Sequence, residues 1–363
     1  MELRLFEQDK SGVNRFGVDN LMWSKDSFVV KELNAFEEYL RDKYKPGNSF
    51  LNNVSQKIIF SGGKRLRPAL VIISGMMGEY DRNKIFPLAA AIETLHTATL
   101  VHDDIIDNAK TRRGQITTSE KHGINIAIYT GDYLLANSIL LLAESGLAVK
   151  ELDRLAKAVK MICTGEVSQF LNRYKLTSVS GYLKRIMKKT GILFSASCAI
   201  GSFASNCDYK QVRTMARIGM NIGIAFQIRD DLLDIEIYGK GAEKIGKPIT
   251  NDIKNGIITL PFIYSAKRSE TVRRSIEELF QITDDLSNVK QREEVFTDKN
   301  VNNNKDINSY IRQIINDVIE SGGVSDAKAL KNRYIQKARN LLETLPQITN
   351  EAKQALEDII NWL

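Results

Sequence analysis

The chain has 363 residues, of which 43% are hydrophobic and 26% are charged, with a formal net charge of +7. This composition is typical of a globular protein with a large core. The positive charge is compatible with anionic ligands such as phosphates, although scattered surface lysines and arginines explain it equally well.

The chain is predicted to be cytoplasmic. Its cysteines are odd in number and lack metal-ligand spacing, as expected for a reduced protein: Cys163, Cys198 and Cys207. The first residues, MELRLFEQDK, lack the apolar core of a signal peptide. The most apolar stretch, residues 124–149, is interrupted by Asp132, Asn137 and Glu144, which argues against an integral membrane protein.

Apolar residues recur with helical spacing along most of the chain. Helices are predicted over residues 28–44, 50–60, 68–75, 85–107, 120–144, 149–174, 178–205, 209–235, 259–280, 306–321, 325–342 and 348–362. Convincing strand alternation is absent, so the predicted fold class is all-α. We expect an N-terminal extension over residues 1–27 and one helical domain over 28–363, with a polar, mobile insertion at 284–308.

Two aspartate-rich motifs end apolar runs, at residues 100–107 (LVHDDIID) and 227–234 (QIRDDLLD). On a helix, Asp103 and Asp107 share one face and Asp104 lies about 100° round from it. The second motif repeats the pattern with Asp230, Asp231 and Asp234. Either motif alone could be a solvated helix end, but two copies flanked by basic loops favour binding of a divalent cation. All-carboxylate ligands indicate a hard ion, Mg²⁺, rather than zinc.

Basic loops accompany both motifs. Residues 61–68 (SGGKRLRP) and 111–114 (TRRG) place lysine and arginine beside glycines that let the backbone approach an anion. A third group follows the second motif and consists of Lys240, Lys244 and Lys247. Each loop alone fits a charged surface turn, whereas together with the carboxylates they predict a site for diphosphate groups.

These segments resemble the trans (E-type) isoprenyl diphosphate synthases. GGKRLRP, LHTATLVHDDIID, TRRG, KKTG, FQIRDDLLD and GKP occur in the order of that family, over about residues 28–345. The resemblance implies a large helical bundle around a central cavity, usually as a homodimer. It implies a prenyltransferase that joins isopentenyl diphosphate to an allylic diphosphate, such as farnesyl diphosphate, by magnesium-assisted ionisation, head-to-tail coupling and proton loss.

The resemblance also implies roles for individual residues. The magnesium-binding and catalytic carboxylates would be Asp103, Asp104, Asp107, Asp230, Asp231 and Asp234. The isopentenyl diphosphate site would comprise Lys64, Arg67, His96 and Arg113. The allylic site would comprise Arg112, Lys189, Thr190, Gln227 and Lys247, with Lys189 also catalytic. The loop that precedes Lys247 is longer than usual in the family, which weakens that assignment.

Product length is predicted from the turn before Asp103. Short-chain relatives often carry a bulky aromatic residue here, whereas this chain has Ala98 and Thr99, with Leu95 and Ile92 one turn further. We therefore expect a medium or long product, between hexaprenyl and decaprenyl diphosphate. In the alternative, Tyr129 or Tyr133 closes the cavity and the product is farnesyl or geranylgeranyl diphosphate.

Three other functions are considered. A class I terpene cyclase would lack GGKRLRP and the second DDLLD motif. A subunit that is active only with a small regulatory partner is a further alternative: the presence of every site residue argues against an inactive scaffold but not against dependence on a partner. A nucleic-acid-binding protein is disfavoured because no basic stripe is interleaved with aromatic residues. Membrane contact is expected to be peripheral at most, for product release.

Overall fold

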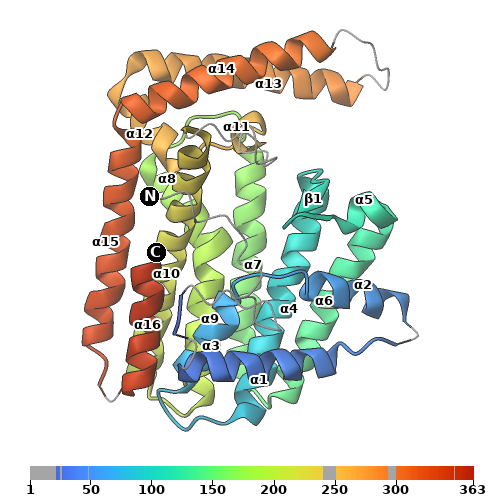
Figure 1. The fold of residues 1–363 in the computed structure, drawn as a ribbon, viewed down its shortest axis with the longest axis vertical. Helices are drawn as coiled ribbons and strands as arrows, with labels where there is room; N and C mark the ends of the chain where they lie inside the picture. The colour runs from blue at the N-terminus through green and yellow to red at the C-terminus, as the bar shows by residue number, and fades with distance from the viewer. Residues whose placement is uncertain (1–21, 25–26, 48, 240–250, 293–299, 347) are drawn as a thin grey trace. The chain divides into compact units, whose positions relative to one another are not determined.

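The computed structural model describes residues 22–363 except 25–26, 48, 240–250, 293–299 and 347. The elements, in chain order, are α1 Phe28–Lys43, α2 Phe50–Ile59, α3 Leu66–Gly75, α4 Arg82–Ile106, β1 Thr111–Arg112, β2 Gln115–Ile116, α5 Thr118–His122, α6 Ile124–Glu144, α7 Val149–Leu171, α8 Val179–Ile186, the π-helix η1 Met187–Gly191, α9 Ile192–Ala204, α10 Tyr209–Gly239, α11 Asn251–Lys254, α12 Leu260–Arg268, α13 Glu270–Arg292, α14 Asn300–Glu320, α15 Gly323–Glu343 and α16 Asn350–Trp362 (Figure 1). The all-α prediction is confirmed.

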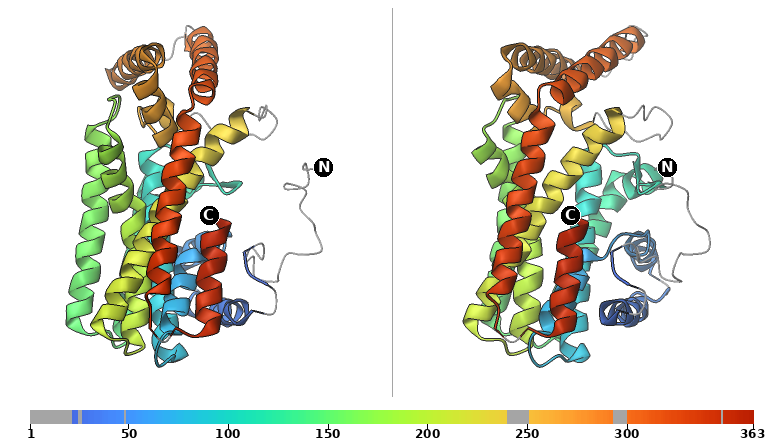
Figure 2. Two further views of the ribbon diagram at one scale, coloured as in Figure 1. Left: turned by 90° about the vertical axis from the view of Figure 1, so that its left-hand side faces the viewer. Right: turned by 60° about the vertical axis from the view of Figure 1, so that its left-hand side comes forward.

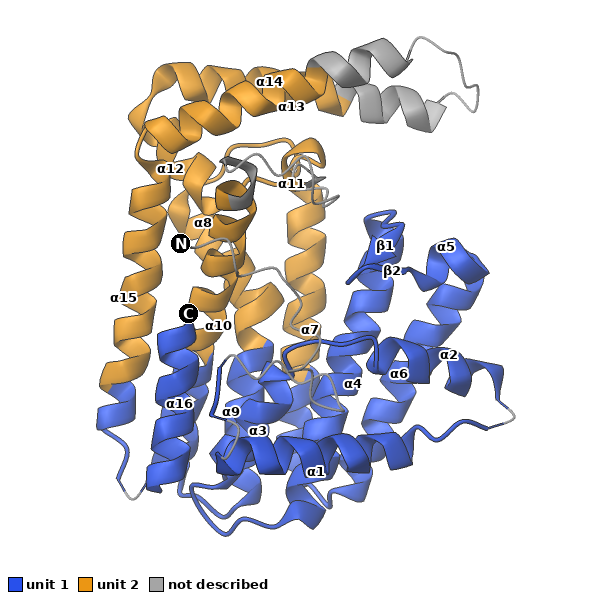
Figure 3. Ribbon diagram, in the orientation of Figure 1, with its two compact units in different colours: residues 1–156, 193–219, 341–362 blue, residues 157–192, 220–340, 363 orange. Residues whose placement is uncertain are grey.

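The chain divides into two compact units (Figure 3). Unit 1 comprises residues 1–156, 193–219 and 341–362, and unit 2 comprises residues 157–192, 220–340 and 363. The divisions fall within α7, α9, α10 and α15 and after α16. The proposed single domain from residue 28 stays a prediction.

In unit 1, α4 packs against both α3 and α6. The Asp81 side chain caps the start of α4 by accepting a hydrogen bond from the backbone N–H of Asn83 at 2.9 Å. Ile85, Leu88 and Ile92 are buried along the helix. The buried length of α4 therefore fixes the direction in which its last turn, with the first aspartate motif, leaves the core.

In unit 2, the C-terminal part of α10 packs into a core shared with α8, α12, α13 and α14. Ile228 and Leu232 of α10 are buried there with Ile263 and Ile276. The adjacent α15 lies beside α10 in both views of Figure 2, and an ion pair of 2.6 Å joins Lys328 to Glu236. The second aspartate motif is thus carried by a helix that is packed on several sides.

The polar segment predicted as an insertion is partly helical. Residues 284–292 belong to α13 and residues 300–308 belong to α14, whereas 293–299 lie outside the described residues. Apolar periodicity missed these turns because most of their residues are polar, and asparagine and aspartate, which are frequent in them, are weak helix formers.

Three other features differ from the predicted helices. Residues 111–116 form an antiparallel hairpin, in which Thr111 pairs with Ile116 and Arg112 with Gln115. The predicted helix over 120–144 is broken at Gly123, whose φ is +85°. The predicted helix over 178–205 contains the π-helical turn η1. Each feature is only a few residues long, so the periodicity of a longer window does not detect it.

Helix α6 combines high hydropathy with unusual exposure. It is the one described helix whose length and composition would allow it to cross a membrane, and its best 18-residue window has a mean hydropathy of 1.5. Only 39% of that window is buried. One exposed face carries Ile128, Tyr129, Ala136, Ile139, Leu140 and Ala143, together with Asn125 and Asp132. Among the residues that the structure describes, this face, which we call the α6 apolar face, is exposed.

Candidate active site

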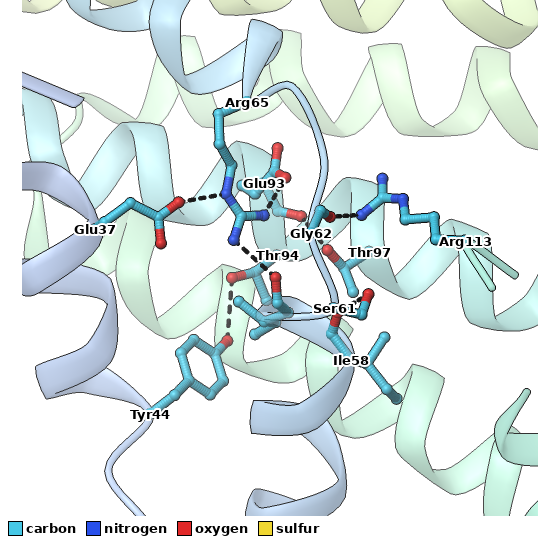
Figure 4. A network of polar contacts seen from close by, with 11 residues as sticks. Glu37, Tyr44, Ile58, Ser61, Gly62, Arg65, Glu93, Thr94, Thr97 and Arg113 are labelled. Atoms are coloured by element: carbon cyan, nitrogen blue, oxygen red, sulfur yellow. Dashed lines mark hydrogen bonds and ion pairs between the residues drawn. The ribbon is translucent and has the colours of Figure 1, made fainter. Parts of the chain in front are cut away.

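The loop between α2 and α3 is held by one buried arginine. Arg65 is 5% exposed and adopts a left-handed φ of +48°. Its guanidinium donates to the Glu37 carboxylate at 2.5 Å, to the Glu93 carboxylate at 2.7 Å and to the Ile59 carbonyl at 2.7 Å (Figure 4). Arg65 therefore anchors the loop to α1 and α4, and its charge is already balanced by two buried carboxylates.

The other two cations of this loop lie over aromatic rings of unit 1. The Lys64 ammonium is 4.4 Å from the ring centroid of Trp362, and the Arg67 guanidinium is 4.6 Å from that of Phe194. An aromatic face attracts a cation without neutralising its charge. Lys64 and Arg67 are thus oriented by contacts with aromatic rings.

The hairpin fixes the arginines of the TRRG segment. Its two loop residues, Arg113 and Gly114, have φ of +52° and +75°, as a tight turn of the I′ type requires. The Arg113 guanidinium donates a hydrogen bond to the Gly62 carbonyl (Figure 4). A Cβ atom at Gly63 would lie only 2.8 Å from Nη1 of Arg113, so the second glycine of the loop makes room for this arginine.

His96 on α4 lies amid this positive charge. Burial is the largest influence and lowers the pKa of the His96 imidazole well below its ordinary value, and the nearby charges of Arg67, Arg113 and Arg112 lower it further. The imidazole is therefore neutral, and it can hydrogen-bond while the arginines supply the charge. Unit 1 thus brings predicted diphosphate-binding residues together around His96.

The three aspartates of the first motif have different surroundings. Asp103 is half-buried and Asp107 is exposed, four residues apart on one face of α4. Asp104 is 7% exposed and accepts a hydrogen bond of 2.5 Å from Nε of Arg112. Burial raises the pKa of Asp104, and the adjacent Arg112 opposes this shift. Asp104 consequently connects the first motif to the hairpin through Arg112. Asp103 and Asp107 form a pair of carboxylates at the C-terminal end of α4.

The second motif belongs to a chain of buried hydrogen bonds in unit 2. The Asp231 carboxylate accepts from the Tyr182 hydroxyl at 2.6 Å and from the Gln227 amide at 2.9 Å. The Thr190 hydroxyl bonds the Gln227 carbonyl at 2.8 Å. Burial raises the pKa of Asp231 to about 7, against the lowering effect of Tyr182 and Gln227. Asp230 is half-buried and Asp234 is exposed.

Lys189 and Thr190 lie on the π-helical turn η1, a distortion that often marks functional positions. The Lys189 ammonium bonds the Glu166 carboxylate at 2.9 Å. A Cβ atom at Gly191 would lie 2.6 Å from the Met220 sulfur, so this glycine permits the close packing of the turn. Lys240, Lys244 and the predicted site residue Lys247 lie outside the described residues.

The carboxylates fit a magnesium ion by their chemistry. In the part of the chain that the structure describes, no group of three or more His, Cys, Asp or Glu side chains could hold a metal by itself. Magnesium is commonly bound by one or two carboxylates, with waters and substrate phosphates completing its shell. The oxygen-only pair Asp103 and Asp107 matches that pattern, and so do Asp230 and Asp234 on α10.

The residues predicted to control product length lie on α4, one turn before the first aspartate motif. Ala98 is 2% exposed, and the Thr99 hydroxyl donates to the His96 carbonyl at 2.8 Å. Leu95 and Ile92 are buried on the preceding turns. Tyr129, one of the two tyrosines considered above as a floor of the cavity, is 60% exposed on the α6 apolar face.

Several residues near these groups were not predicted from the sequence. They are Glu37, Glu93, Glu166 and Tyr182. The sequence does contain an indication for the first two. Glu37 lies between the buried residues Phe36 and Leu40 of α1, and Glu93 comes directly after the apolar run 85–92. A charge at such a position needs a partner. Nothing in the local pattern around Tyr182 distinguishes it from an ordinary core tyrosine.

The chain is thus all-α, with aspartate-rich motifs on two helices and an arginine cluster around His96. Residues 48–279 match the polyprenyl synthetase family, and the chain belongs to that family. Members of this family use isoprenoid diphosphate substrates, and the chain is accordingly a prenyltransferase.

Related proteins extend this similarity beyond the matched residues. The heptaprenyl diphosphate synthase component 2 of Geobacillus stearothermophilus is 33% identical, over 93% of this chain and 96% of that protein. The crystal structure of heptaprenyl diphosphate synthase from Staphylococcus aureus has a TM-score of 0.78 and 30% identity, covering 92% of this chain and 96% of the other. That of geranylgeranyl pyrophosphate synthase from Lactobacillus brevis has a TM-score of 0.79 and 27% identity, covering 95% and 99%. The predicted isoprenoid synthase fold is confirmed.

Proposed function

We propose that this prenyltransferase elongates an allylic diphosphate, such as farnesyl diphosphate, with isopentenyl diphosphate to give a medium or long all-trans polyprenyl diphosphate. The observation that carries the proposal is the cluster of Arg67, Arg112 and Arg113 around a neutral His96, on the helix that ends with the first aspartate motif. Such a cluster suits a substrate with several negative charges.

The two diphosphates are assigned to different residues. Isopentenyl diphosphate would bind Lys64, Arg67, His96 and Arg113 in unit 1. The allylic diphosphate is assigned by sequence to Arg112, Lys189, Thr190 and Gln227, of which the last two are hydrogen-bonded to each other. Lys247 belongs to the same assignment by sequence. The neutral imidazole of His96 can donate to a phosphate oxygen without adding charge.

Magnesium is assigned to the two aspartate motifs, chiefly to Asp103 and Asp107 and to Asp230 and Asp234. When bound, it would add positive charge at the diphosphate oxygens and so assist departure of the leaving group. Asp104 and Asp231 belong to the same motifs, but each accepts a hydrogen bond from its own unit.

The reaction then has three steps: departure of the diphosphate, formation of the carbon–carbon bond and loss of a proton. The cations hold the allylic diphosphate and stabilise the diphosphate that leaves when its carbon–oxygen bond breaks. The double bond of isopentenyl diphosphate attacks the resulting allylic carbocation and forms a carbon–carbon bond. Loss of a proton, which the released diphosphate can accept, completes the step. No side-chain nucleophile is needed, and Lys189 would act by charge.

Product length is proposed from the small residue at position 98. Ala98 and Thr99 leave no aromatic side chain one turn before Asp103, and Tyr129 is 60% exposed. The names of two related proteins, both heptaprenyl diphosphate synthases, support a product of this class. The geranylgeranyl synthase has an equally similar fold, so the fold does not decide product length.

Ala98→Phe tests this proposal. A phenyl ring would add volume where the growing chain must pass, so the variant should release farnesyl or geranylgeranyl diphosphate while condensation continues. Products of the wild type and the variant are compared by mass spectrometry after incubation with isopentenyl and farnesyl diphosphates. Ala329→Phe, at an exposed position of α15, is the matched control and should keep the wild-type product. A wild-type product that already stops at geranylgeranyl diphosphate would overturn the proposed length.

A second candidate is a catalytic subunit that needs a small partner. The name "component 2" of the Geobacillus stearothermophilus relative favours it. Assay of the purified chain with and without added cell extract from its source separates the two, because an independent enzyme needs no addition.

We also propose that the chain forms a homodimer through the α6 apolar face. Ile139, Leu140 and Tyr129 are 59%, 61% and 60% exposed on this face, and burying them against a second copy would remove that apolar area from water. The one carboxylate of the face, Asp132, lies 3.4 Å from the His102 imidazole of its own chain.

Ile139→Glu should convert the dimer into a monomer, because a charge at the centre of the interface would be buried unpaired. Light scattering coupled to size exclusion measures the mass of the wild type and the variant. Val149→Glu, at an isolated residue that is 82% exposed, is the control and should leave the dimer intact. A monomeric wild type would refute the interface.

The proposed location is the cytoplasm. All three cysteines, which the structure describes, are free, as in a reducing compartment. Contact with a membrane would be peripheral and would serve release of the apolar product.

A further inference from the structure

Tyr182 is a fully buried tyrosine whose hydroxyl faces a carboxylate. Its ring is 0% exposed, and its hydroxyl donates to Oδ2 of Asp231 at 2.6 Å. The guanidinium of Arg185 lies 5.3 Å from the ring centroid and donates to the Ile258 carbonyl at 2.6 Å. Because both the ring and its neighbour are fixed, the hydroxyl has little freedom to take another partner.

Tyr182 and Gln227 together engage both oxygens of Asp231. Asp231 is also 6% exposed, in contrast with the exposed Asp234 on the same helix. A buried carboxylate that accepts one hydrogen bond on each oxygen is suited to hold its donors in place. Its accessibility for an ion is correspondingly lower than that of Asp230 or Asp234.

The acceptor character of Asp231 sets the direction of the whole hydrogen-bonded chain. A carboxylate only accepts, so the Gln227 side chain must turn its NH₂ group toward Asp231 and its carbonyl toward Thr190. The Thr190 hydroxyl must then be the donor to that carbonyl. This arrangement leaves the second N–H of the Gln227 amide as a donor for a further acceptor, such as a phosphate oxygen.

We propose that Tyr182 is a positioning residue for the allylic diphosphate site. By holding Asp231, it orients Gln227 and Thr190, and Asp231 serves as an internal anchor for these two residues rather than as a metal ligand. The inference rests on the proposed function, because it takes Gln227 and Thr190 as part of the allylic site.

Removal of the Tyr182 hydroxyl should selectively weaken the binding of one substrate, the allylic diphosphate. Tyr182→Phe leaves one Asp231 oxygen without its donor, so the carboxylate is held less firmly and Gln227 loses its fixed acceptor; we expect the KM for farnesyl diphosphate to rise by about 10-fold. The KM for isopentenyl diphosphate should stay within about 2-fold, since that substrate is assigned to other residues. Titration calorimetry should show a matching loss of affinity for farnesyl diphosphate in the presence of magnesium.

Two further variants separate positioning from a general structural role. Tyr310→Phe is the matched control, because the Tyr310 hydroxyl also donates to a carboxylate of unit 2, that of Glu278 at 2.8 Å. It should leave both KM values unchanged. Thr190→Val removes the other end of the hydrogen-bonded chain, and combining it with Tyr182→Phe should raise the allylic KM by less than the product of the two single effects.

The outcomes distinguish this inference from the proposed function. A wild type that binds neither diphosphate and does not condense them refutes the function itself. A functional wild type whose Tyr182→Phe variant is unchanged, or whose two KM values rise equally, overturns the positioning role. A selective rise in the allylic KM, coupled to Thr190, supports it.

Discussion

Replacing Asp103 by asparagine is expected to slow condensation by about 10²–10³-fold, the largest loss of activity of any variant considered. Asp103 and Asp107 share one face of α4 beside the arginine cluster, and they are the carboxylates assigned to magnesium there. The substitution keeps the shape of the side chain but removes the charge that would bind the ion. Steady-state rates at saturating substrates and a range of magnesium concentrations measure the effect.

Two variants sharpen this test. Asp42→Asn, at an exposed site of α1 paired with Lys45, should keep the wild-type rate. Asp104→Asn should lose less activity than Asp103→Asn, because Asp104 is buried against Arg112 and would act through the hairpin. Wild-type turnover in a chelator, or in the Asp103→Asn variant, would contradict the assignment of magnesium to this motif.

Replacing Arg65 by methionine is expected to lower the free energy of unfolding by about 3–5 kcal/mol. The guanidinium lies between Glu37 and Glu93, and the side chains of the three residues are 4%, 1% and 6% exposed. Without Arg65, two buried carboxylates would lose their counter-charge. Equilibrium denaturation in urea, followed by circular dichroism, measures the change.

Arg154→Met is the control for this stability prediction. Its ion pair with Glu151 is also an arginine–carboxylate contact, but the Arg154 side chain is 42% exposed, so its loss should cost less than about 1 kcal/mol. Adding Glu37→Gln and Glu93→Gln to Arg65→Met should restore part of the stability, since the unpaired charges are then gone. Equal stability of the Arg65 and Arg154 variants would show that the buried network is not important for folding.

Most of the fold follows from helical periodicity in the sequence. The predicted helix over 85–107 and the observed α4 differ by three residues at the start, where Asp81 caps the helix. The hairpin at 111–116 was missed because each strand has only two residues, and its signal is the Arg113–Gly114 pair with positive φ. The α13 and α14 extensions were missed because most of their residues are polar.

The site residues were identified from short motifs, but their partners were not. The order of GGKRLRP, TRRG and the two aspartate motifs indicated which charged residues belong to the site. The sequence did not show that Arg65 forms ion pairs with Glu37 and Glu93. These contacts join residues 28 positions apart, and the Tyr182–Asp231 bond joins residues 49 apart. Such pairings depend on how helices pack, which local spacing does not contain.

Incorporation of labelled isopentenyl diphosphate by the purified chain alone tests the central claim most directly. The chain is incubated with farnesyl diphosphate and magnesium, and the products are identified by mass spectrometry. We expect all-trans polyprenyl diphosphates between hexaprenyl and decaprenyl, with one diphosphate released for each isoprene unit added. Conversion of farnesyl diphosphate to a cyclic hydrocarbon, without uptake of isopentenyl diphosphate, would contradict the assignment.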